Sequence, residues 1–182
     1  SLSSSKIVIM GMAQSGKSTI IEVVIKGADP TKLTKYQATL DYKREPSTIR
    51  GQQVELFDLG GQVSFLDRFT KGELAEFIFS NVSGMIYVVD VKNIDQLSQS
   101  KYYFELAMKR LDDYSPNSQV VIFLHKIDLL QPNLMHEILT NIKEFFLTGL
   151  NNEIKSRLKF YETTIFNKSI FNAFNCLLYT SP

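Results

Sequence analysis

A phosphate-binding loop is predicted at residues 11–18, where two glycines five positions apart are followed by a lysine and a hydroxyl residue. In this pattern the glycines let the backbone curl so that its N–H groups converge on a phosphate, Lys17 reaches the β- and γ-oxygens, and Ser18 can ligate Mg²⁺. The motif lies between an apolar run at 6–10, suited to a buried strand, and an apolar helix at 19–25 whose positive end favours anions. Strand, loop and helix in this order favour phosphate binding over an ordinary turn rich in glycine and serine.

A second group of residues suited to nucleotide chemistry, Asp58, Gly61 and Gln62, follows an alternating apolar segment at 52–57. A carboxylate there can hold Mg²⁺ through water, a glycine N–H can meet a γ-phosphate, and the glutamine can orient an attacking water. By itself this pattern also fits an Asp/Gly turn that closes a strand. Because it follows a strand, and the phosphate loop does so too, a nucleotide site is the better interpretation.

A third motif, Lys126 and Asp128, follows the apolar segment 119–124. A carboxylate has two acceptor oxygens and no donor, so it pairs bidentately with a base edge that offers two adjacent N–H donors. Guanine has such an edge and adenine does not. The aliphatic stem of Lys126 can cover the base while its ammonium stays in water. A lone pair of this kind is usually a solvated turn, but three motifs in this order predict a guanine-nucleotide site.

The elements that must position these motifs alternate between strands and helices, which predicts an α/β fold. Strands are expected at 6–10, 43–50, 52–57, 85–90, 119–124 and 159–163, and helices at 19–25, within 65–79, at 96–114, after Pro132 and at 170–178. The arms on either side of Gly51 form a hairpin, Pro46 confines the first arm to a sheet edge, and 31–42 forms a loop. We therefore expect a mostly parallel six-stranded sheet with one antiparallel edge strand, helices on both faces and ligands at the carboxyl ends of the strands.

Composition excludes several classes of protein. The chain has 182 residues, net charge +1 and a pI near 7.7, so it fits one domain at 6–182, and its charge gives no reason to expect nucleic-acid binding. A single cysteine, Cys176, excludes an internal disulfide, and we expect it to be buried in a helix. No apolar run is long enough to span a membrane, and residues 1–5 are expected to be a disordered tail or an expression remnant.

The three motifs resemble those of the Ras-like GTPases, and the resemblance covers essentially the whole chain. It is carried by GxxxxGKS at 11–18, DxxGQ at 58–62 and KxD at 126–128. The resemblance implies a three-layer P-loop NTPase fold that binds GTP and GDP with Mg²⁺.

Within that superfamily the chain resembles the Rag/Gtr branch. His125 stands where most relatives have asparagine, and the phrases at 86–90 and 163–165 are also typical of that branch. The subclass stays open. The segments 38–41 and 58–62 look more like the Rag A and B subclass, whereas the first helix and 169–174 look more like the Rag C and D subclass.

The resemblance implies roles for particular residues. Nucleotide binding is expected from Ala13, Gln14, Ser15, Gly16, Lys17, Ser18, Thr19, Thr39, Gly61, His125, Lys126, Asp128, Thr164 and Ile165. Gln62 and Lys17 would be catalytic, and Mg²⁺ would be held by Ser18, Thr39 and Asp58. Thr39 is the expected switch I threonine, with Thr34 and Thr48 as the alternatives.

Two residues depart from the pattern of most relatives. His125 replaces an asparagine that usually steadies the phosphate loop, which puts nucleotide affinity in question, although the Rag branch shares this histidine. Ala13 replaces a glycine found in many relatives, and its methyl group can crowd the transition state. We therefore expect slow intrinsic hydrolysis.

The resemblance further implies a heterodimer of unlike Rag proteins, joined through a C-terminal domain. Such a pair would sit on the lysosomal or vacuolar surface through a scaffold and signal amino-acid supply to the TORC1 pathway, with effector and activating proteins as further partners. Because the chain ends at Pro182, about where a GTPase domain should end, we expect the dimerisation domain to be absent and the isolated domain to be largely monomeric. Membrane insertion is not expected.

Two other functions compete with a working GTPase. A P-loop kinase or ATPase shares the first motif, but such enzymes usually need arginines over the γ-phosphate. The arginines of this chain form no cluster: Arg44, Arg50, Arg68, Arg110 and Arg157. A scaffold that binds GTP or GDP with negligible turnover stays open, because only a rate measurement separates it from a GTPase.

Two segments, 31–44 and 61–79, are expected to change with the nucleotide, because the γ-phosphate and Mg²⁺ would hold them. The second segment is rich in large apolar residues. We expect Phe77 to pack on a neighbouring helix, and Phe65, Leu66 and Phe69 to form a partner-binding surface.

Overall fold

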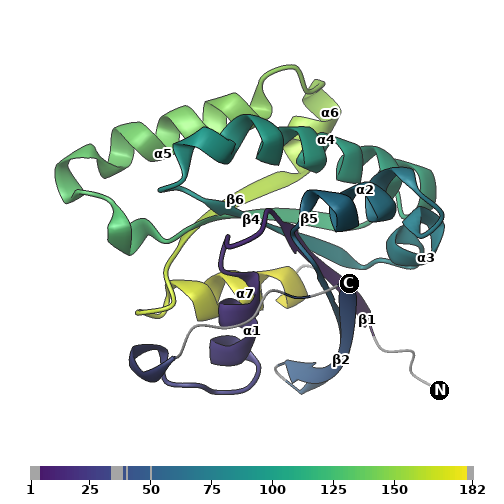
Figure 1. The fold of residues 1–182 in the computed structure, drawn as a ribbon, viewed down its shortest axis with the longest axis horizontal. Coiled ribbons are helices and arrows are strands. Elements are labelled where there is room, and N and C mark those ends of the chain that lie inside the picture. Colours follow the sequence, from purple (N-terminus) through teal and green to yellow (C-terminus); the bar gives the residue numbers. More distant parts are fainter. Residues whose placement is uncertain (1–4, 34–38, 40, 50, 180–182) are drawn as a thin grey trace.

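The fold consists of a six-stranded sheet between two layers of helices (Figure 1). The structure is a computed structural model and describes residues 5–33, 39, 41–49 and 51–179. It confirms the predicted α/β architecture. Within the described residues no helix is long and apolar enough to cross a bilayer.

The strands lie in the order β2-β3-β1-β4-β5-β6, and all neighbours are parallel except the antiparallel pair β2 and β3. Their bounds are β1 (Ser5–Gly11), β2 (Tyr42–Ile49), β3 (Gln52–Leu59), β4 (Gly84–Asp90), β5 (Gln119–His125) and β6 (Leu158–Thr163). The antiparallel edge strand is therefore confirmed. Pro46 lies in that strand, where its missing N–H removes no interior ladder bond.

Helices cover both faces of the sheet (Figure 1). One face carries α2 (Val63–Lys71), α3 (Ala75–Phe79), α4 (Leu97–Tyr114), α5 (Pro132–Leu147) and α6 (Asn152–Arg157), and the other carries α1 (Lys17–Val24) and α7 (Ser169–Tyr179). Short 3₁₀ turns lie at Pro30–Lys32, Ile94–Gln96 and Ile127–Leu129.

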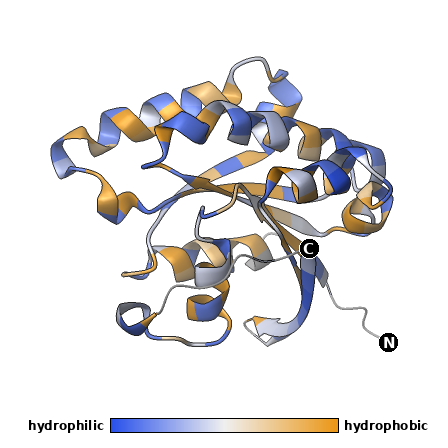
Figure 2. Ribbon diagram, viewed as in Figure 1, coloured by the Kyte–Doolittle hydropathy of each residue, from blue (hydrophilic) through white to orange (hydrophobic). Residues whose placement is uncertain are grey.

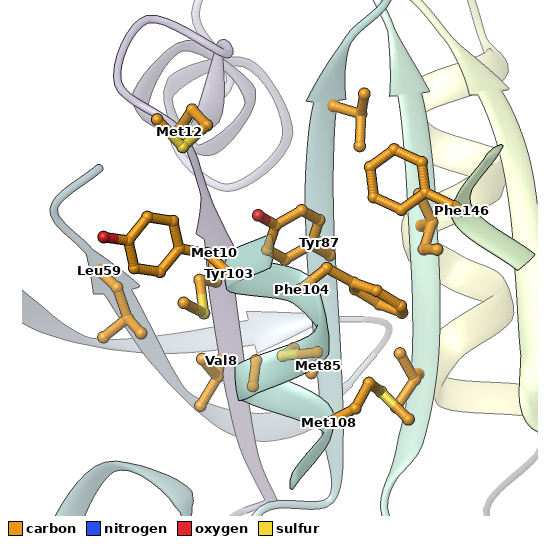
Figure 3. Packing of buried hydrophobic residues seen from close by; sticks show 14 of the residues in the cluster. Val8, Met10, Met12, Leu59, Met85, Tyr87, Tyr103, Phe104, Met108 and Phe146 are labelled. Atoms are coloured by element: carbon orange, nitrogen blue, oxygen red, sulfur yellow. The ribbon is translucent and has the colours of Figure 1, made fainter. Parts of the chain in front are cut away.

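Successive strand residues point to opposite helical layers, which explains the continuous apolar runs in the sequence. In β1, Val8 and Met10 join the core under α2 to α6, whereas Ile7 and Ile9 join the core with α1 and α7. Apolar residues accordingly gather along the strands and the inner sides of the helices (Figure 2). Figure 3 shows the larger core, with aromatic and methionine side chains packed over β1 and β4.

Some elements differ from the sequence expectations. Helix α6 was not predicted, although Asn151 caps it by accepting the N–H of Ile154 at 2.8 Å. Ser5 belongs to β1 and not to a disordered tail, while residues 1–4 lie outside the described part of the chain. Cys176 lies in α7 as expected but is only half-buried.

The expected roles of the apolar residues after Gln62 are wrong in two places. Leu66 and Phe69 are fully buried, so in this structure they form no partner-binding surface. The cause is helical spacing: residues three apart in α2 share one face, and this face packs on the sheet. Phe65 is half-buried against the same core. Phe77, expected to pack on a helix, is 44% exposed, and the aromatic contacts of its ring are with Tyr42 and Phe57 of strands β2 and β3.

Replacing Phe69 with alanine should lower the free energy of unfolding by about 3–5 kcal/mol, because it empties a fully buried site. Phe77→Ala removes the same group from a half-exposed position and should cost less than about 1.5 kcal/mol. Urea unfolding at fixed nucleotide concentration measures both. Equal losses would mean that α2 does not hold Phe69 in the core.

Candidate nucleotide site

The motifs meet in one cleft of about 520 Å³ at the carboxyl edge of the sheet. This volume is typical of small-molecule sites. The strand register explains the meeting, since Ile9 pairs with Asp58, and His125 pairs with both Asp90 and Thr163. The cleft is lined by Ala13, Gln14, Gly16, Lys17, Ser18, Thr19, Thr39, Gly61, Gln62, His125, Lys126, Asp128, Leu129, Ile165 and Phe166.

The phosphate loop depends on a glycine immediately before α1. Gly16 has φ +106°, a conformation that residues with a Cβ rarely adopt. A Cβ there would also lie 2.8 Å from Cδ2 of His125. The loop therefore turns into the helix with His125 packed directly against it.

Lys17 lies under the loop, and its ammonium group is buried. It donates hydrogen bonds to the carbonyl oxygens of Gly11 and Met12, at 2.8 and 2.9 Å, and a longer one of 3.4 Å to Ser15 Oγ. Burial lowers the pKa of Lys17 to about 8, and the nearby charge of Asp58 opposes this shift. A phosphate in the cleft would stabilise the charged ammonium.

Gly61 joins the second motif to the phosphate loop. Its carbonyl accepts the N–H of Ala13 at 2.9 Å. A Cβ at Gly61 would lie 2.4 Å from the Ala13 nitrogen and 2.7 Å from Lys17 Nζ, so only glycine permits this approach. The loop and the start of the segment at 61–79 are thus in direct backbone contact.

Ser18, Thr39 and Asp58 converge as a candidate Mg²⁺ site. The hydroxyls of Ser18 and Thr39 are 3.1 Å apart, and Thr39 Oγ1 donates to Asp58 Oδ2 at 3.2 Å. The other oxygen of Asp58, Oδ1, is buried and has no hydrogen-bond partner among the described residues. Burial raises the pKa of Asp58, while Lys17 and the Thr39 hydrogen bond oppose the rise. A buried carboxylate with an unpaired oxygen fits a bound cation.

The donor set of this candidate site is all oxygen, which suits Mg²⁺. Within the described residues no cluster of three His, Cys, Asp or Glu side chains is found, so a softer metal has no evident site. Mg²⁺ usually keeps several waters and takes few protein ligands, as two hydroxyls and one carboxylate would provide. Of the alternative threonines, Thr48 lies in β2 away from the cleft lining, and Thr34 lies outside the described residues.

His125 lies between the phosphate loop and β6. Its Nδ1 is 2.8 Å from the hydroxyl of Thr163, and its other edge faces Gly16. Burial and the adjacent Lys126 charge lower the pKa of His125 to about 4, so the ring is neutral at physiological pH. The histidine therefore supports the loop by packing, as a ring fixed by one hydrogen bond.

Lys126 ties the loop to the neighbouring strand. Its ammonium donates to the Gln14 carbonyl at 2.7 Å and to Asp90 Oδ2 at 2.9 Å. The residue has φ +69°, a left-handed conformation that is unusual for a lysine. This strained backbone is what turns the chain from β5 towards Asp128.

At the far end of the cleft the exposed Asp128 is oriented by its neighbours. Thr164 Oγ1 donates to Asp128 Oδ1 at 2.8 Å, and the same oxygen of Thr164 accepts the N–H of Phe166 at 3.2 Å. The N–H of Thr164 in turn donates to Ser169 Oγ. A carboxylate held in this way presents acceptor oxygens to a planar base.

Thirteen of the sixteen residues expected from the sequence line this cleft. The other three, Ser15, Asp58 and Thr164, are buried directly behind it and contact lining residues or the loop. Their roles in binding stay predictions. Two lining residues were missed, Leu129 and Phe166, whose side chains are 51% and 55% exposed. The sequence could have indicated them, because Leu129 directly follows Asp128 and Phe166 directly follows Ile165, at positions where a solvated loop would have polar residues.

Known proteins of one family are similar to this chain over most of its length. Residues 6–180 match the family model of the Gtr1/RagA G protein conserved region. GTP-binding protein GTR1 of Saccharomyces cerevisiae is 28% identical over 177 residues, which cover 93% of this chain and 54% of that protein. Ras-related GTP-binding protein C of Homo sapiens is 27% identical over 177 residues, 93% of this chain and 42% of that protein. GTP-binding protein gtr2 of Schizosaccharomyces pombe is 29% identical over 179 residues, with 93% and 53% covered.

The chain thus spans about half the length of the relatives it matches. The nearly equal identities to GTR1 and to protein C favour neither subclass. Among solved structures, the Arl6 BBS3 small GTPase from Trypanosoma brucei with bound GppNp superposes with a TM-score of 0.72 at 19% identity, over 98% of this chain and 97% of that one. This likeness supports the fold.

Phe166→Ala should weaken the binding of GDP about 5- to 150-fold, because stacking of a base on an aromatic ring contributes roughly 1–3 kcal/mol. Phe171→Ala is the matched control, since Phe171 is also exposed, at 40%, but lies in α7 and does not line the cleft. Competition with a fluorescent GDP analogue measures both. Equal losses in the two variants would exclude a role of Phe166 in holding the base.

Proposed function

The chain belongs to the Gtr1/RagA family of G proteins, and we propose that it is a guanine-nucleotide switch that binds GTP or GDP with Mg²⁺ and hydrolyses GTP slowly. One observation carries the proposal. A single cleft has a phosphate loop with a buried lysine at one end and the oriented carboxylate of Asp128 at the other. These are the groups that a guanosine di- or triphosphate needs at its two ends.

Mg²⁺ would be held by Ser18, Thr39 and Asp58. When bound, the ion would supply positive charge against the phosphates. Thr39 and Asp58 are hydrogen-bonded to each other. Without the ion, these two side chains therefore still satisfy part of their hydrogen-bonding capacity. Because Thr39 lies in the segment 31–44, its binding to Mg²⁺ would link this segment to the nucleotide state.

Hydrolysis would depend on Gln62. This residue is exposed, lines the cleft and directly precedes α2, which suits a side chain that orients an attacking water. Ala13 stands beside it in the lining, and none of the four described arginines lines the cleft. An arginine supplied in trans is worth about 10³–10⁵ in rate, so we propose that an activating protein is required for fast turnover.

The cellular role that we propose follows the family. The chain would act in a heterodimer with a complementary Rag-type GTPase, peripheral to the lysosomal or vacuolar membrane through a scaffold protein, and would signal amino-acid availability to the TORC1 pathway. The relatives' names support only GTP binding, and the chain covers about half of their length. The dimer partner and the scaffold are therefore proposals about the whole protein.

Two alternatives make different predictions for the same cleft. A P-loop kinase or ATPase is disfavoured because the described arginines pair elsewhere: Arg44 with Glu55, Arg68 with Asp41, Arg110 with Asp113 and Arg157 with Asp112. A GTP- or GDP-binding scaffold with negligible turnover uses the same binding residues, and differs only in the rate of hydrolysis.

Asp128→Asn should shift nucleotide preference from guanine towards xanthine. The reason is chemical: xanthine offers an acceptor where guanine has an amino donor, and an amide supplies the matching N–H. Competition of GDP, XDP and ADP against a fluorescent nucleotide tests this, with the wild type expected to prefer GDP strongly over ADP. Similar affinities of the wild type for ADP and GDP would contradict the proposed function.

Gln62→Leu should slow single-turnover GTP hydrolysis about tenfold or more and leave the Kd for GTP within about twofold, because the residue acts on the water and not on the nucleotide. Release of phosphate from preloaded GTP gives the rate. If the wild type is already as slow as Gln62→Leu, the scaffold alternative replaces the GTPase.

A further inference from the structure

Helix α2 sets the position of Gln62, since the helix begins with the next residue. The backbone carbonyl of Gln62 accepts the N–H groups of Phe65 and Leu66 and so belongs to the first turn. The Gln62 side chain is exposed and lines the cleft. Its place in the cleft therefore depends on what holds α2.

The buried face of α2 fixes the helix against the sheet but not its exact orientation. Leu66 and Phe69 are fully buried, and apolar contacts of this kind are non-directional. Apolar packing sets which face of α2 meets the sheet, and a directional polar contact can hold the helix more exactly in that position. Among the described residues, two side chains of α2 make hydrogen bonds to other elements, Asp67 and Arg68, and a third, Lys71, lies over the Tyr102 ring of α4 at 5.0 Å.

The first link comes from Tyr103 on α4. Its hydroxyl donates to Asp67 Oδ1 at 2.6 Å, a short bond to a charged acceptor. The Tyr103 side chain is only 3% exposed, so its ring is held firmly in the core. Figure 3 shows the ring beside Met10 with its hydroxyl directed to the β3 side, away from Tyr87. A rigid donor therefore reaches out of the core to α2.

The charges agree with this direction of donation. The hydrogen bond from Tyr103 lowers the pKa of Asp67, so the carboxylate is ionised at neutral pH. Burial and the same bond raise the pKa of Tyr103 to about 12, so its hydroxyl keeps its proton. Lys71 also faces Asp67, at 3.3 Å, but this ion pair lies within α2. Its ammonium lies over the Tyr102 ring of α4 at 5.0 Å, and cation–π contacts at exposed sites such as this one are weak.

The second link is weaker. Arg68 Nη1 lies 3.2 Å from Asp41 Oδ1, and both side chains are about half exposed, at 54% and 40%. Exposed ion pairs contribute little because water and salt screen them. The bond from Tyr103 is thus the main directional attachment of α2.

We propose that Tyr103 is a positioning residue for GTP hydrolysis: through its bond to Asp67 it holds α2 so that Gln62 faces the attacking water. This inference rests on the proposed GTPase function. It assigns no contact between Tyr103 and the nucleotide, so nucleotide affinity should not depend on the hydroxyl.

Tyr103→Phe removes the hydroxyl and keeps the buried ring. We expect the single-turnover rate constant to fall about 3- to 10-fold, as for loss of one typical hydrogen bond at a partly buried site, with the Kd for GTP and GDP unchanged within twofold. Tyr87→Phe is the matched control, since it removes another buried hydroxyl, whose bond runs to the Ser100 carbonyl of α4 at 2.6 Å and not to α2. Equal rate losses in both variants would mean that lower stability of the protein causes the loss, and would overturn the role of Tyr103.

Epistasis shows whether Tyr103 acts through Gln62. In a Gln62→Leu background, Tyr103→Phe should have no further effect on the rate. A full additional loss in the double variant would overturn the proposal. Asp67→Asn keeps a carbonyl acceptor and should lose less rate than Asp67→Ala, which removes it.

Amide hydrogen exchange tests the attachment without relying on turnover. Residues 63–71 should exchange faster in Tyr103→Phe than in Tyr87→Phe, with either nucleotide bound, and unchanged exchange would overturn the attachment. A Gln62→Leu variant as fast as the wild type would overturn the proposed function. A normal dependence on Gln62 with an unaffected rate in Tyr103→Phe would overturn only the inference about Tyr103.

Discussion

The site depends on two opposite charges that the fold buries without pairing them directly. Among the described residues, Lys17 donates to two carbonyls and a hydroxyl, and Asp58 keeps one oxygen without a hydrogen-bond partner. Burial shifts both pKa values towards the neutral forms, so each charge is held at a cost. An anion beside Lys17 and a cation beside Asp58 would reverse both shifts, so binding of a magnesium nucleotide would also stabilise the fold.

The parallel sheet makes this burial possible. Its carboxyl edge brings the ends of β1, β3 and β5 together, and each end supplies a different chemical group. The close contact of Gly61 with Ala13 and Lys17 then joins the phosphate loop to the segment that carries Gln62. Rigid strands and one backbone contact thus place groups that are far apart in the sequence within one cleft.

Much of this arrangement could be predicted, for physical reasons. Buried parallel strands read as continuous apolar runs, so the segments that became β4 and β5 were clear, and Pro46 correctly indicated an edge. Helix α6 was missed because its six residues include a single large apolar side chain, Ile154, and so show no periodicity. The exposure of Phe77 and the burial of Phe69 depend on how two short helices separated by Gly72 are rotated, which tertiary packing decides. Leu129 and Phe166 were missed for the same reason: one ends a short 3₁₀ turn and the other lies in a turn after β6, and only the folded chain brings both to the cleft.

The neutral ring of His125 affects how the stability of this domain depends on pH. The pKa of His125 is about 4 in the folded chain, below the ordinary value of 6.5. Between these two pH values the unfolded chain therefore binds a proton on this ring and the folded chain does not. This residue therefore makes the fold less stable as the pH falls from about 6.5 towards 4, while its charge in the native site stays unchanged. Through this histidine, acidification lowers the stability of the fold without changing the charge beside the nucleotide cleft.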